Sequence, residues 1–338
     1  MILITGGAGY IGSHVAKQLL EKNEDIIIVD NLSTGSKETI NTLQKIKPFK
    51  FVELDLKEFD KVEKLLQEEN IDTIIHFAAS IVVPESVENP LKYYLNNTVN
   101  TTNLVKSAIK NGVKKFIFSS TAAVYGEPKE IPSNGISEEN ETKPINPYGA
   151  SKLMSEQVLK DSAKAYEDFK YVIFRYFNVA GADINYENST LAPRIGQSFP
   201  NATHLIKIAS ECAAKKREKM YIFGKDYPTP DGTCVRDYIH VDDLALAHIK
   251  AIEYLEENPS DIFNLGYGKG ASVQEVIEKV KEVTRSDFTV EDAPRRAGDP
   301  AMLIANNTKF IQAFGDIFKY NDLSLISKSA YEWEKRVK

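Results

Sequence analysis

The sequence predicts an α/β protein built on a doubly wound parallel sheet, followed by a second, smaller α/β domain. Three observations predict this fold: short strand patterns alternate with helical patterns through the first half, a glycine-rich turn joins the first strand to the first helix, and an aspartate ends the second strand. Alternation of this kind gives a parallel sheet covered by helices on both faces. Right-handed crossovers then make the sheet doubly wound.

The elements follow in chain order. Strands are expected at Ile2–Thr5, Asp25–Asp30, Lys50–Leu54, Ile71–Ala78, Val113–Ser119 and Tyr171–Arg175, and helices at Ile11–Glu21, Phe59–Glu69, Asn89–Asn111 and Tyr148–Tyr166. Segment Glu127–Pro147 is rich in Pro, Gly, Asn and Glu and is expected to be a long loop, often a functional feature. Further helices are expected at Thr203–Lys216, Val241–Glu256 and Ser272–Val283. We therefore expect a first domain over residues 1–177 and a second over 178–338, with segments that return to the first.

Composition excludes several classes of protein. Hydrophobic residues make up 42% and charged residues 27%, which is typical of a globular protein. The net charge is -6 without a long basic run, which argues against a nucleic-acid partner. Cys212 and Cys234 form no CxxC pair and no zinc spacing, so reduced thiols in a cytoplasmic protein and no metal are expected. No apolar stretch has membrane-spanning length, and the early glycine turn leaves no room for a signal peptide.

The glycine-rich turn predicts a dinucleotide site of the Rossmann type. Gly7, Gly9 and Gly12 fit GxGxxG, and Gly6, Gly9 and Gly12 fit GxxGxxG. Glycines let the backbone approach a pyrophosphate, and the helix N-terminus favours its charge. Asp30 lies about twenty residues on, where a carboxylate accepts ribose hydroxyls and repels a 2′-phosphate. The pattern therefore favours NAD over NADP, although a bare glycine turn alone would be weak evidence.

A tyrosine and a lysine are candidates for proton transfer. Tyr148 and Lys152 are four residues apart at the start of a helix, which puts both side chains on one face. An ammonium nearby would stabilise a phenolate and lower the tyrosine pKa, as a general base requires. Thr121 ends an expected strand, and its hydroxyl could bind a reacting oxygen. Without the dinucleotide turn upstream, the same spacing would be read as a surface pair.

These motifs form an ordered series along the chain. TGGAGYIG, HFAA, FSSTAAVYG, YGASK and RYFN resemble the extended short-chain dehydrogenase/reductases, and YIFGKDYPTPDGTCVRDYIHVDD, NLGYG and APRRAGDP resemble the UDP-galactose 4-epimerases among them. The resemblance covers nearly the whole chain. It implies an NAD-dependent isomerase that interconverts UDP-glucose and UDP-galactose through a transient 4-keto sugar. It also implies a homodimer, formed through a helix bundle.

The resemblance also assigns roles to individual residues. It places NAD against Gly6, Gly9, Tyr10, Ile11, Gly12, Asp30, Asn31, Asp55, Leu56, Phe77, Ala78, Asn96, Ser119, Tyr148, Lys152 and Tyr176. It places the UDP-sugar against Thr121, Tyr148, Asn178, Leu205, Phe223, Arg236, Tyr238, Arg295, Asp299 and Leu303. Tyr148, Lys152 and Thr121 would be catalytic. Arg236 and Arg295 suit the substrate pyrophosphate, because guanidinium groups match phosphate oxygens, although each could equally form a surface ion pair.

Two positions depart from the family pattern. His204 aligns where a substrate-contacting asparagine is expected, and a solvent-facing role is the alternative. Leu303 aligns where strict hexose epimerases often carry tyrosine, and a smaller side chain would leave room for the 2-acetamido group of UDP-GlcNAc and UDP-GalNAc. Simple loop packing is the alternative reading of Leu303.

Two other functions are alternatives to epimerisation. Nucleotide-sugar 4,6-dehydratases resemble this chain but carry Asp-Glu after the strand-end threonine, where Ala122 and Ala123 stand here. A non-enzymatic NAD-binding sensor would typically lack the tyrosine or the lysine, and both are present. The sequence does not distinguish plain from N-acetylated hexoses, and it does not indicate the pathway.

Overall fold

The computed structural model describes residues 1–128, 134–199, 203–296 and 299–337. The chain forms two compact units. The first unit comprises Met1–Gly126, Glu141–Tyr176 and Ala245–Phe263, and the second comprises Glu127–Asn140, Phe177–Leu244 and Asn264–Lys338. Part of the expected 127–147 loop, residues 129–133, lies outside the described residues. The expected division into a domain over residues 1–177 and a domain over residues 178–338 stays a prediction.

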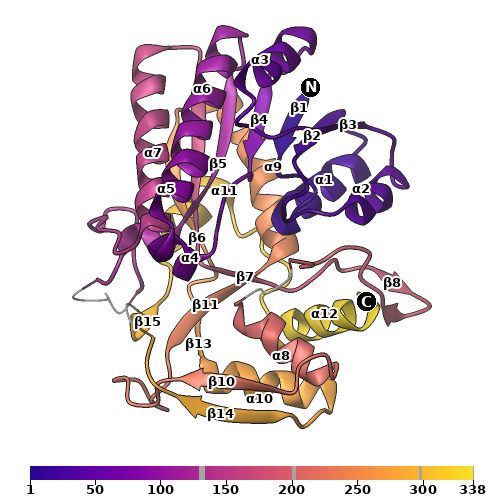
Figure 1. Ribbon diagram of the computed structural model, residues 1–338, viewed down its shortest axis with the longest axis vertical. Helices are drawn as coiled ribbons and strands as arrows, with labels where there is room; N and C mark the ends of the chain where they lie inside the picture. Colours follow the sequence, from indigo (N-terminus) through magenta and orange to yellow (C-terminus); the bar gives the residue numbers. More distant parts are fainter. Residues whose placement is uncertain (129–133, 200–202, 297–298, 338) are drawn as a thin grey trace. The chain divides into compact units, whose positions relative to one another are not determined.

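The first unit is built on a seven-stranded sheet (Figure 1). Its strands are β1 (Ile2–Thr5), β2 (Ile26–Asp30), β3 (Lys50–Glu53), β4 (Thr73–His76), β5 (Lys115–Thr121), β6 (Lys170–Tyr176) and β12 (Asp261–Leu265). Their order is β12-β6-β5-β4-β1-β2-β3, and the pairings from β6 to β3 are all parallel. This is the Rossmann order, and it confirms the predicted fold class. Because the strand order reverses between β1 and β4, the carboxyl ends of these strands form the ligand crevice of such a sheet.

Helices cover both faces of this sheet. They are α1 (Tyr10–Glu21), α2 (Lys37–Gln44), α3 (Phe59–Glu68), α4 (Val83–Glu88), α5 (Pro90–Tyr93), a π-helix η1 (Tyr94–Val99), α6 (Asn100–Lys110), a 3₁₀ turn η2 (Ala122–Tyr125), α7 (Pro147–Ala165) and α9 (Val241–Glu257), the last shared between the units. Helices α3, α6 and α7 lie side by side in one layer, and α1 packs with α2 in the other (Figure 1).

The core of the first unit explains why its strands are so apolar. Every residue of β1, β2 and β4 is buried, because helices cover both faces of the sheet. On one side of the sheet, Leu3, Ile74 and Phe116 pack with Leu104 of α6 and Leu159 of α7. This packing fixes the strand ends from which the site residues project.

The second unit is organised around one buried strand. Its strands are β7 (Asn178–Ala180), β8 (Tyr186–Glu187), β9 (Thr190–Leu191), β10 (Lys219–Phe223), β11 (Val235–His240), β13 (Gly270–Ser272), β14 (Thr289–Ala293) and β15 (Met302–Leu303), and its helices are α8 (Leu205–Ala213), α10 (Val273–Thr284), α11 (Thr308–Phe314) and α12 (Leu323–Arg336). Strand β11 pairs with β7, β13 and β15, and β10 pairs with β14. Helices α8, α10 and α12 pack on one another over a second apolar core.

Helix boundaries follow local capping. Asn146 accepts a hydrogen bond from the Gly149 amide at 2.9 Å, and Pro147 occupies the first turn of α7, where its missing N–H costs nothing. Ser272 and Glu275 form a reciprocal capping box on α10. Both helices therefore begin within one residue of the predicted start.

One expectation about helices was wrong, and helices α2, α4, α11 and α12 were not predicted. The single helix expected over Asn89–Asn111 is three segments, α5, η1 and α6, with the π-helix in the middle. A hydrophobic pattern does not reveal a π segment, because one inserted residue barely changes the periodicity. Helix α12 was not predicted at all, although Asp322 caps it by accepting from the Ser324 amide.

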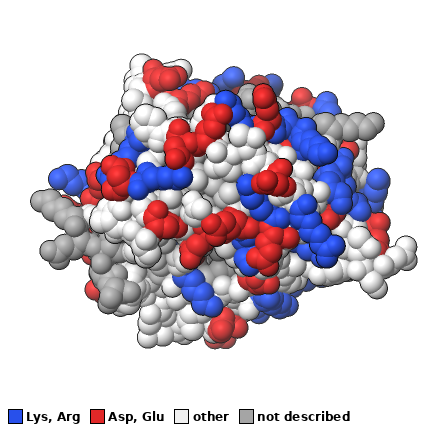
Figure 2. Space-filling model, turned by 90° about the horizontal axis from the view of Figure 1, so that it is seen from below, with Lys and Arg blue, Asp and Glu red and all other residues white. Residues whose placement is uncertain are grey.

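Charges of both signs are mixed on the surface. Figure 2 shows one face, on which Lys and Arg side chains alternate with Asp and Glu side chains. Among the described residues of the second unit, Lys219 pairs with Glu291 and Lys281 pairs with Asp287. In the described part of the chain, no helix is long and apolar enough to cross a membrane.

Candidate active site

The turn between β1 and α1 has the shape that a phosphate cradle requires. Gly6 has φ +72°, and a Cβ built on it would lie 2.7 Å from the Ala78 backbone nitrogen. A Cβ on Gly12 would lie 2.9 Å from the Gly7 Cα and closer still to the Gly6 carbonyl oxygen. Gly9 is the N-cap of α1 and offers no side chain to its first amides. The turn thus closes only with glycines at positions 6 and 12, and it leaves backbone amides at a helix N-terminus.

Asp30 lies at the carboxyl end of β2, beside this turn. Its carboxylate accepts the Ala8 amide at 3.0 Å and the Leu32 amide at 2.8 Å. Burial raises the pKa of Asp30, and the two amide bonds oppose that rise. These bonds hold the carboxylate in one orientation while each oxygen keeps a second lone pair, which is the geometry expected for a ribose acceptor.

The side chains predicted around adenine lie next along the sheet edge. Asn31 donates to a carboxylate oxygen of Asp55 at 3.0 Å, and the Lys57 amide donates to the other oxygen at 3.0 Å. Leu56 is buried behind them. Asn31, Asp55 and Leu56 therefore lie together at the ends of β2 and β3, and the role in NAD binding that the resemblance implies for them stays a prediction.

The π-helix carries one of the predicted cofactor residues. Asn96 lies in η1, where its amide donates to the Ser80 hydroxyl at 3.0 Å and its carbonyl oxygen accepts from Asn100 at 3.2 Å. The neighbouring Asn97 accepts from the Ser80 amide and donates to the Ser80 carbonyl and the Ser151 hydroxyl. This pairing ties the segment after β4 to α7. Asn97 was missed by sequence reasoning, since an asparagine inside a helical pattern gives no signal of such a link.

Tyr148 and Lys152 lie on the first two turns of α7. The Lys152 ammonium is buried, 3% exposed, and donates to the Ser119 carbonyl at 2.8 Å, with the Ser119 hydroxyl at 3.5 Å. Its nitrogen also lies 4.8 Å from the centre of the Phe118 ring. The structure therefore brings together Tyr148, Lys152 and the end of β5, where Thr121 is half-buried.

The charge states of this cluster differ in one respect from expectation. Loss of water around the hydroxyl raises the pKa of Tyr148, and its hydrogen bond with Thr121 offsets part of that rise. Burial lowers the pKa of Lys152 to about 7, against the opposing attraction of Glu156. The pKa of Tyr148 in the protein alone is therefore raised rather than lowered, because loss of water around its hydroxyl is the largest effect.

Tyr176 and Phe77 complete the cofactor side of the cluster. The Tyr176 hydroxyl hydrogen-bonds Nε2 of His248, and the Phe77 ring lies 5.0 Å from the same imidazole. Burial raises the pKa of Tyr176, and Tyr148 adds to the rise. His248, on α9, was missed from sequence because it lies far along the chain.

In the second unit, β11 gathers four of the predicted substrate residues. Arg236 and Tyr238 are two residues apart and so project from the same face of the strand. Tyr238 pairs in register with Asn178 of β7, and Arg236 pairs with Leu303 of β15. The parallel strands therefore bring together residues that are up to 125 positions apart in the sequence (303 − 178).

The two predicted pyrophosphate arginines are both in ion pairs. Arg236 is 8% exposed, and its guanidinium lies 3.2 Å from the carboxylate of Asp299. Arg295 is exposed and pairs with Asp226 at 2.6 Å, with its guanidinium 4.0 Å from the centre of the Tyr227 ring. The structure thus joins Arg236 with Asp299. Arg295 forms a surface ion pair, which was the alternative to a role in pyrophosphate binding.

Phe223 ends β10, and another arginine lies over its ring. The guanidinium carbon of Arg296 is 3.8 Å from the ring centre, and this arginine had not been singled out. Phe223 is the last residue of β10, and Arg296 lies in the segment that follows β14. Strands β10 and β14 are neighbours and pair in parallel. A binding role for Phe223 stays a prediction.

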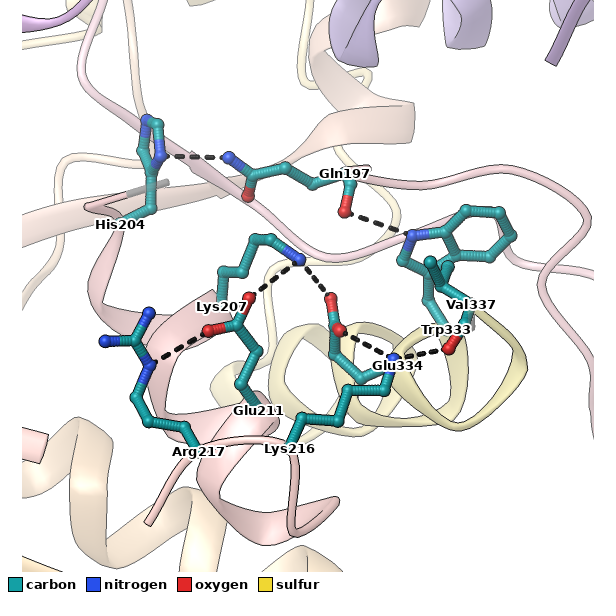
Figure 3. A network of polar contacts seen from close by, with 9 residues as sticks. All are labelled: Gln197, His204, Lys207, Glu211, Lys216, Arg217, Trp333, Glu334 and Val337. Atoms are coloured by element: carbon teal, nitrogen blue, oxygen red, sulfur yellow. Dashed lines mark hydrogen bonds and ion pairs between the residues drawn. The ribbon is translucent and has the colours of Figure 1, made fainter. Parts of the chain in front are cut away.

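His204 lies at the N-cap of α8, immediately before Leu205 (Figure 3). It is exposed, and its Nδ1 lies 2.9 Å from the side-chain nitrogen Nε2 of Gln197. The backbone carbonyl of Gln197 in turn accepts a hydrogen bond from the Trp333 indole at 3.2 Å. A cavity of about 20 Å³ is lined by His204, Leu205, Asn178 and Tyr238 among others. The histidine is therefore both solvent-exposed and adjacent to predicted substrate residues.

Below it, α8 and α12 share a buried charge network (Figure 3). The Lys207 ammonium lies 2.5 Å from Glu334 and 3.3 Å from Glu211, and Lys216 also reaches Glu334 at 3.3 Å. Lys207 and Glu334 are 7% and 3% exposed. This network fixes the N-terminal turn of α8, from which Leu205 projects.

Metal chemistry finds no support in the part of the chain described. Among these residues, no group of three or more His, Cys, Asp or Glu side chains could hold a metal ion. Both cysteines are buried free thiols. The fold and the glycine turn instead define a nucleotide-binding α/β protein with a tyrosine–lysine pair at its sheet edge.

The chain belongs to the NAD dependent epimerase/dehydratase family, whose model matches residues 2–266. It is 45% identical over 335 residues to the UDP-glucose 4-epimerase of Azospirillum brasilense, covering 99% of this chain and 92% of that protein. It is similar to the UDP-Glc/GlcNAc 4-epimerase of Campylobacter jejuni, with 56% identity, a TM-score of 0.86 and 99% of each chain covered. A further similar structure is the UDP-glucose 4-epimerase of Bifidobacterium longum in complex with NAD+ and UDP, with 37% identity, a TM-score of 0.92, and 99% and 98% of the two chains covered.

Proposed function

We propose that this protein is an NAD-dependent 4-epimerase that interconverts UDP-glucose and UDP-galactose through a transient 4-keto sugar. The observation that carries the proposal is the combination of the glycine cradle, Asp30 and the Tyr148–Lys152 pair at one sheet edge, in a chain 45% identical to a UDP-glucose 4-epimerase. When bound beside the glycine cradle and Asp30, NAD would supply the hydride chemistry that the inversion of C4 requires. The residues of the first unit would then transfer the proton of the 4-hydroxyl and orient the sugar and the cofactor.

Each residue has a proposed task in this reaction. Asp30 would accept the ribose hydroxyls, and the α1 amides would hold the dinucleotide pyrophosphate. The phenolate oxygen of Tyr148 would take the proton of the 4-hydroxyl and later return it, while Thr121 orients the 4-oxygen. The Lys152 ammonium would stabilise the phenolate and bind the cofactor ribose.

The residues of the second unit would hold the UDP-sugar. Arg236 and Arg295 would bind the pyrophosphate, each exchanging its carboxylate partner for phosphate oxygens. Tyr238, Asn178 and Phe223 would contact the remainder of the substrate. The nucleotide must stay fixed while the sugar presents first one face and then the other, so strong contacts are needed at the phosphates rather than at the sugar.

Conversion of UDP-galactose to UDP-glucose by the purified protein tests this function. Tyr148→Phe removes the proton-accepting oxygen and should lower kcat by about 100-fold or more, on typical general-base effects. Lys22→Ala is a matched control, because this residue ends α1 at the opposite end of the helix from the glycine cradle. Near-full turnover in Tyr148→Phe, with the control unchanged, would contradict the assignment.

The dehydratase alternative lacks its acid and base. Ala122 and Ala123 follow Thr121 in η2, where the Thr121 hydroxyl accepts from the Ala123 amide at 3.1 Å. Neither side chain can transfer a proton. A 4-keto-6-deoxy product from UDP-glucose would nevertheless reveal dehydration directly.

We also propose that the enzyme interconverts UDP-GlcNAc and UDP-GalNAc. Leu303 is half-buried beside Arg236 in the β15–β11 pair, and the similar Campylobacter jejuni protein is named a UDP-Glc/GlcNAc 4-epimerase. Leu303→Tyr should abolish turnover of the N-acetylated substrates and spare UDP-galactose, because tyrosine would fill the space of the acetamido group. Leu303→Met keeps the volume and serves as the control; equal loss of both substrates in Leu303→Tyr would refute the gate.

We further propose a cytoplasmic homodimer. An apolar stripe, which comprises Val87, Leu91, Leu95 and Val99, repeats every four residues over α4, α5 and η1, and its members are 63%, 70%, 61% and 38% exposed. These helices pack against α7, where Met154 is 48% exposed. A contiguous apolar face of this kind is typical of an interface with a second copy. Leu91→Arg should halve the mass measured by light scattering, whereas Lys106→Glu on α6 should leave it unchanged.

A further inference from the structure

A buried ion pair lies directly behind the proposed catalytic residues. Arg175 of β6 donates to both carboxylate oxygens of Glu156 on α7, at 3.0 and 2.7 Å. Glu156 is fully buried and Arg175 is 3% exposed. The Ser120 hydroxyl donates to Glu156 at 2.6 Å, and Arg175 donates to the Tyr125 hydroxyl at 2.9 Å. Both carboxylate oxygens and all three guanidinium nitrogens thus make hydrogen bonds inside the protein, and the Lys160 ammonium lies 3.7 Å from the same carboxylate.

Each member of this network adjoins a proposed site residue. Ser120 lies on β5 between Ser119, which accepts from Lys152, and Thr121. Arg175 directly precedes Tyr176 on β6. Because side chains alternate across a strand, the side chains of Ser120 and Arg175 point to the opposite face of the sheet from those of the adjacent site residues on β5 and β6. The network therefore joins the strands and the helix of the site from behind.

Glu156 also continues the face of α7 that carries the catalytic pair. Tyr148, Lys152 and Glu156 follow one another at intervals of four residues, so successive side chains are neighbours on the helix surface. The Lys152 nitrogen is out of water and bonded to a neutral carbonyl. The carboxylate of Glu156 raises the pKa of Lys152 and so opposes the effect of burial.

We propose, resting on the epimerase function above, that Glu156 and Arg175 are positioning residues: they fix α7 against β5 and β6 and keep a carboxylate one turn behind Lys152, so that this lysine remains an ammonium. Without that charge, burial would favour the neutral amine, which cannot stabilise a phenolate. The other groups around Lys152 do not replace Glu156. His76 on β4 is neutral, since burial lowers its pKa to about 3, and Tyr148 and Tyr176 are uncharged phenols at rest.

The test is the pH dependence of kcat for UDP-galactose in the NAD-loaded enzyme. Activity requires the Lys152 ammonium, so it is present below the pKa of Lys152 and is lost as pH rises through it. Glu156→Gln removes the stabilising charge and should move this alkaline limb about one pH unit toward acid, the low end of the effect of an opposite charge nearby. The ratio of wild-type to variant kcat should then grow with pH, to about tenfold above the wild-type limb. KM for UDP-galactose should stay unchanged.

Two further variants separate charge from fold. Glu156→Asp keeps the negative charge but has a shorter side chain that reaches Arg175 less well, so it should lower kcat and leave the alkaline limb at the same pH. If Glu156→Gln does not fold, a displaced alkaline limb in Glu156→Asp overturns the proposal. Glu334→Gln removes an equally buried carboxylate from an ion pair of the second unit and should leave the limb in place. An unmoved limb in Glu156→Gln, or equal movement in Glu334→Gln, also overturns the proposal. A wild-type enzyme inactive on UDP-galactose would instead contradict the proposed function.

Discussion

Replacing Gly12 by alanine should separate cofactor binding from folding. The new Cβ would lie 2.9 Å from the Gly7 Cα, 3.0 Å from the Gly6 carbonyl carbon and closer still to the Gly6 oxygen. All three atoms belong to the backbone, so no side chain can turn aside and the turn itself must open. Overpacking of this kind costs about 1–3 kcal/mol. The same displacement moves the amides that would hold the pyrophosphate, and we therefore expect Gly12→Ala to be purified without NAD.

Gly112→Ala is the matched control for that experiment. Gly112 follows α6 with φ +76°, and nothing lies within 4 Å of a Cβ built on it. The left-handed backbone alone should cost about 1–2 kcal/mol, similar to the cost at Gly12. Both variants should therefore lose similar stability in chemical denaturation, whereas only Gly12→Ala should lose the NAD released by denaturing the purified protein. Full NAD content in Gly12→Ala, or equal NAD loss in the control, would refute the cradle.

Three other predictions concern charged side chains. Arg236→Met should raise KM for the UDP-sugar by about tenfold or more, the effect of one charged hydrogen bond, whereas Arg217→Met, on an exposed pair, should leave it unchanged; equal KM values would place the pyrophosphate elsewhere. Glu334→Gln should lower the free energy of unfolding in urea by about 1–3 kcal/mol, because the Lys207 ammonium would lose its nearer carboxylate and keep Glu211 at 3.3 Å; a loss below about 0.5 kcal/mol would show that water reaches the ammonium. The double variant Glu156→Leu with Arg175→Met should lose about 1–3 kcal/mol of unfolding free energy, because an apolar pair replaces a buried ion pair at little cost but the Ser120 hydroxyl loses its acceptor; it should also show the displaced alkaline limb, and a normal limb would separate the pair from Lys152.

The first unit could be predicted well because its signals are local. The glycine turn, Asp30 and the YxxxK spacing each depend on residues close together in sequence, and the strand alternation fixes which ends they occupy. The resemblance to the extended short-chain dehydrogenase/reductases supplied roles for positions such as Asn96 and Tyr176. The order of the strands then followed from the fold class.

The remaining features depend on pairing at long range. Sequence gives no register between β11 and β15, so the neighbourhood of Arg236 and Leu303 could be reached only by resemblance. His248 meets Tyr176 across 72 positions, and Glu334 meets Lys207 across 127. No local pattern marks such partners, because a buried polar residue on a helix looks like a solvated one until its neighbours are known.

The tyrosine–lysine pair alone is an incomplete description of the site. Burying Lys152 orients its nitrogen and excludes water, but burial by itself favours the neutral amine. A tyrosine base that depends on a buried lysine ammonium therefore needs a buried negative charge near that lysine. The buried negative charge in turn needs a cation as its partner, because an unpaired charge is costly to bury. Glu156 and Arg175 meet these two requirements, one from the helix of the pair and the other from the strand beneath it. In the proposed mechanism, one face of α7 therefore carries Tyr148 and Lys152 for proton transfer and Glu156 as a positioning residue, with Arg175 as the cation that pairs with Glu156.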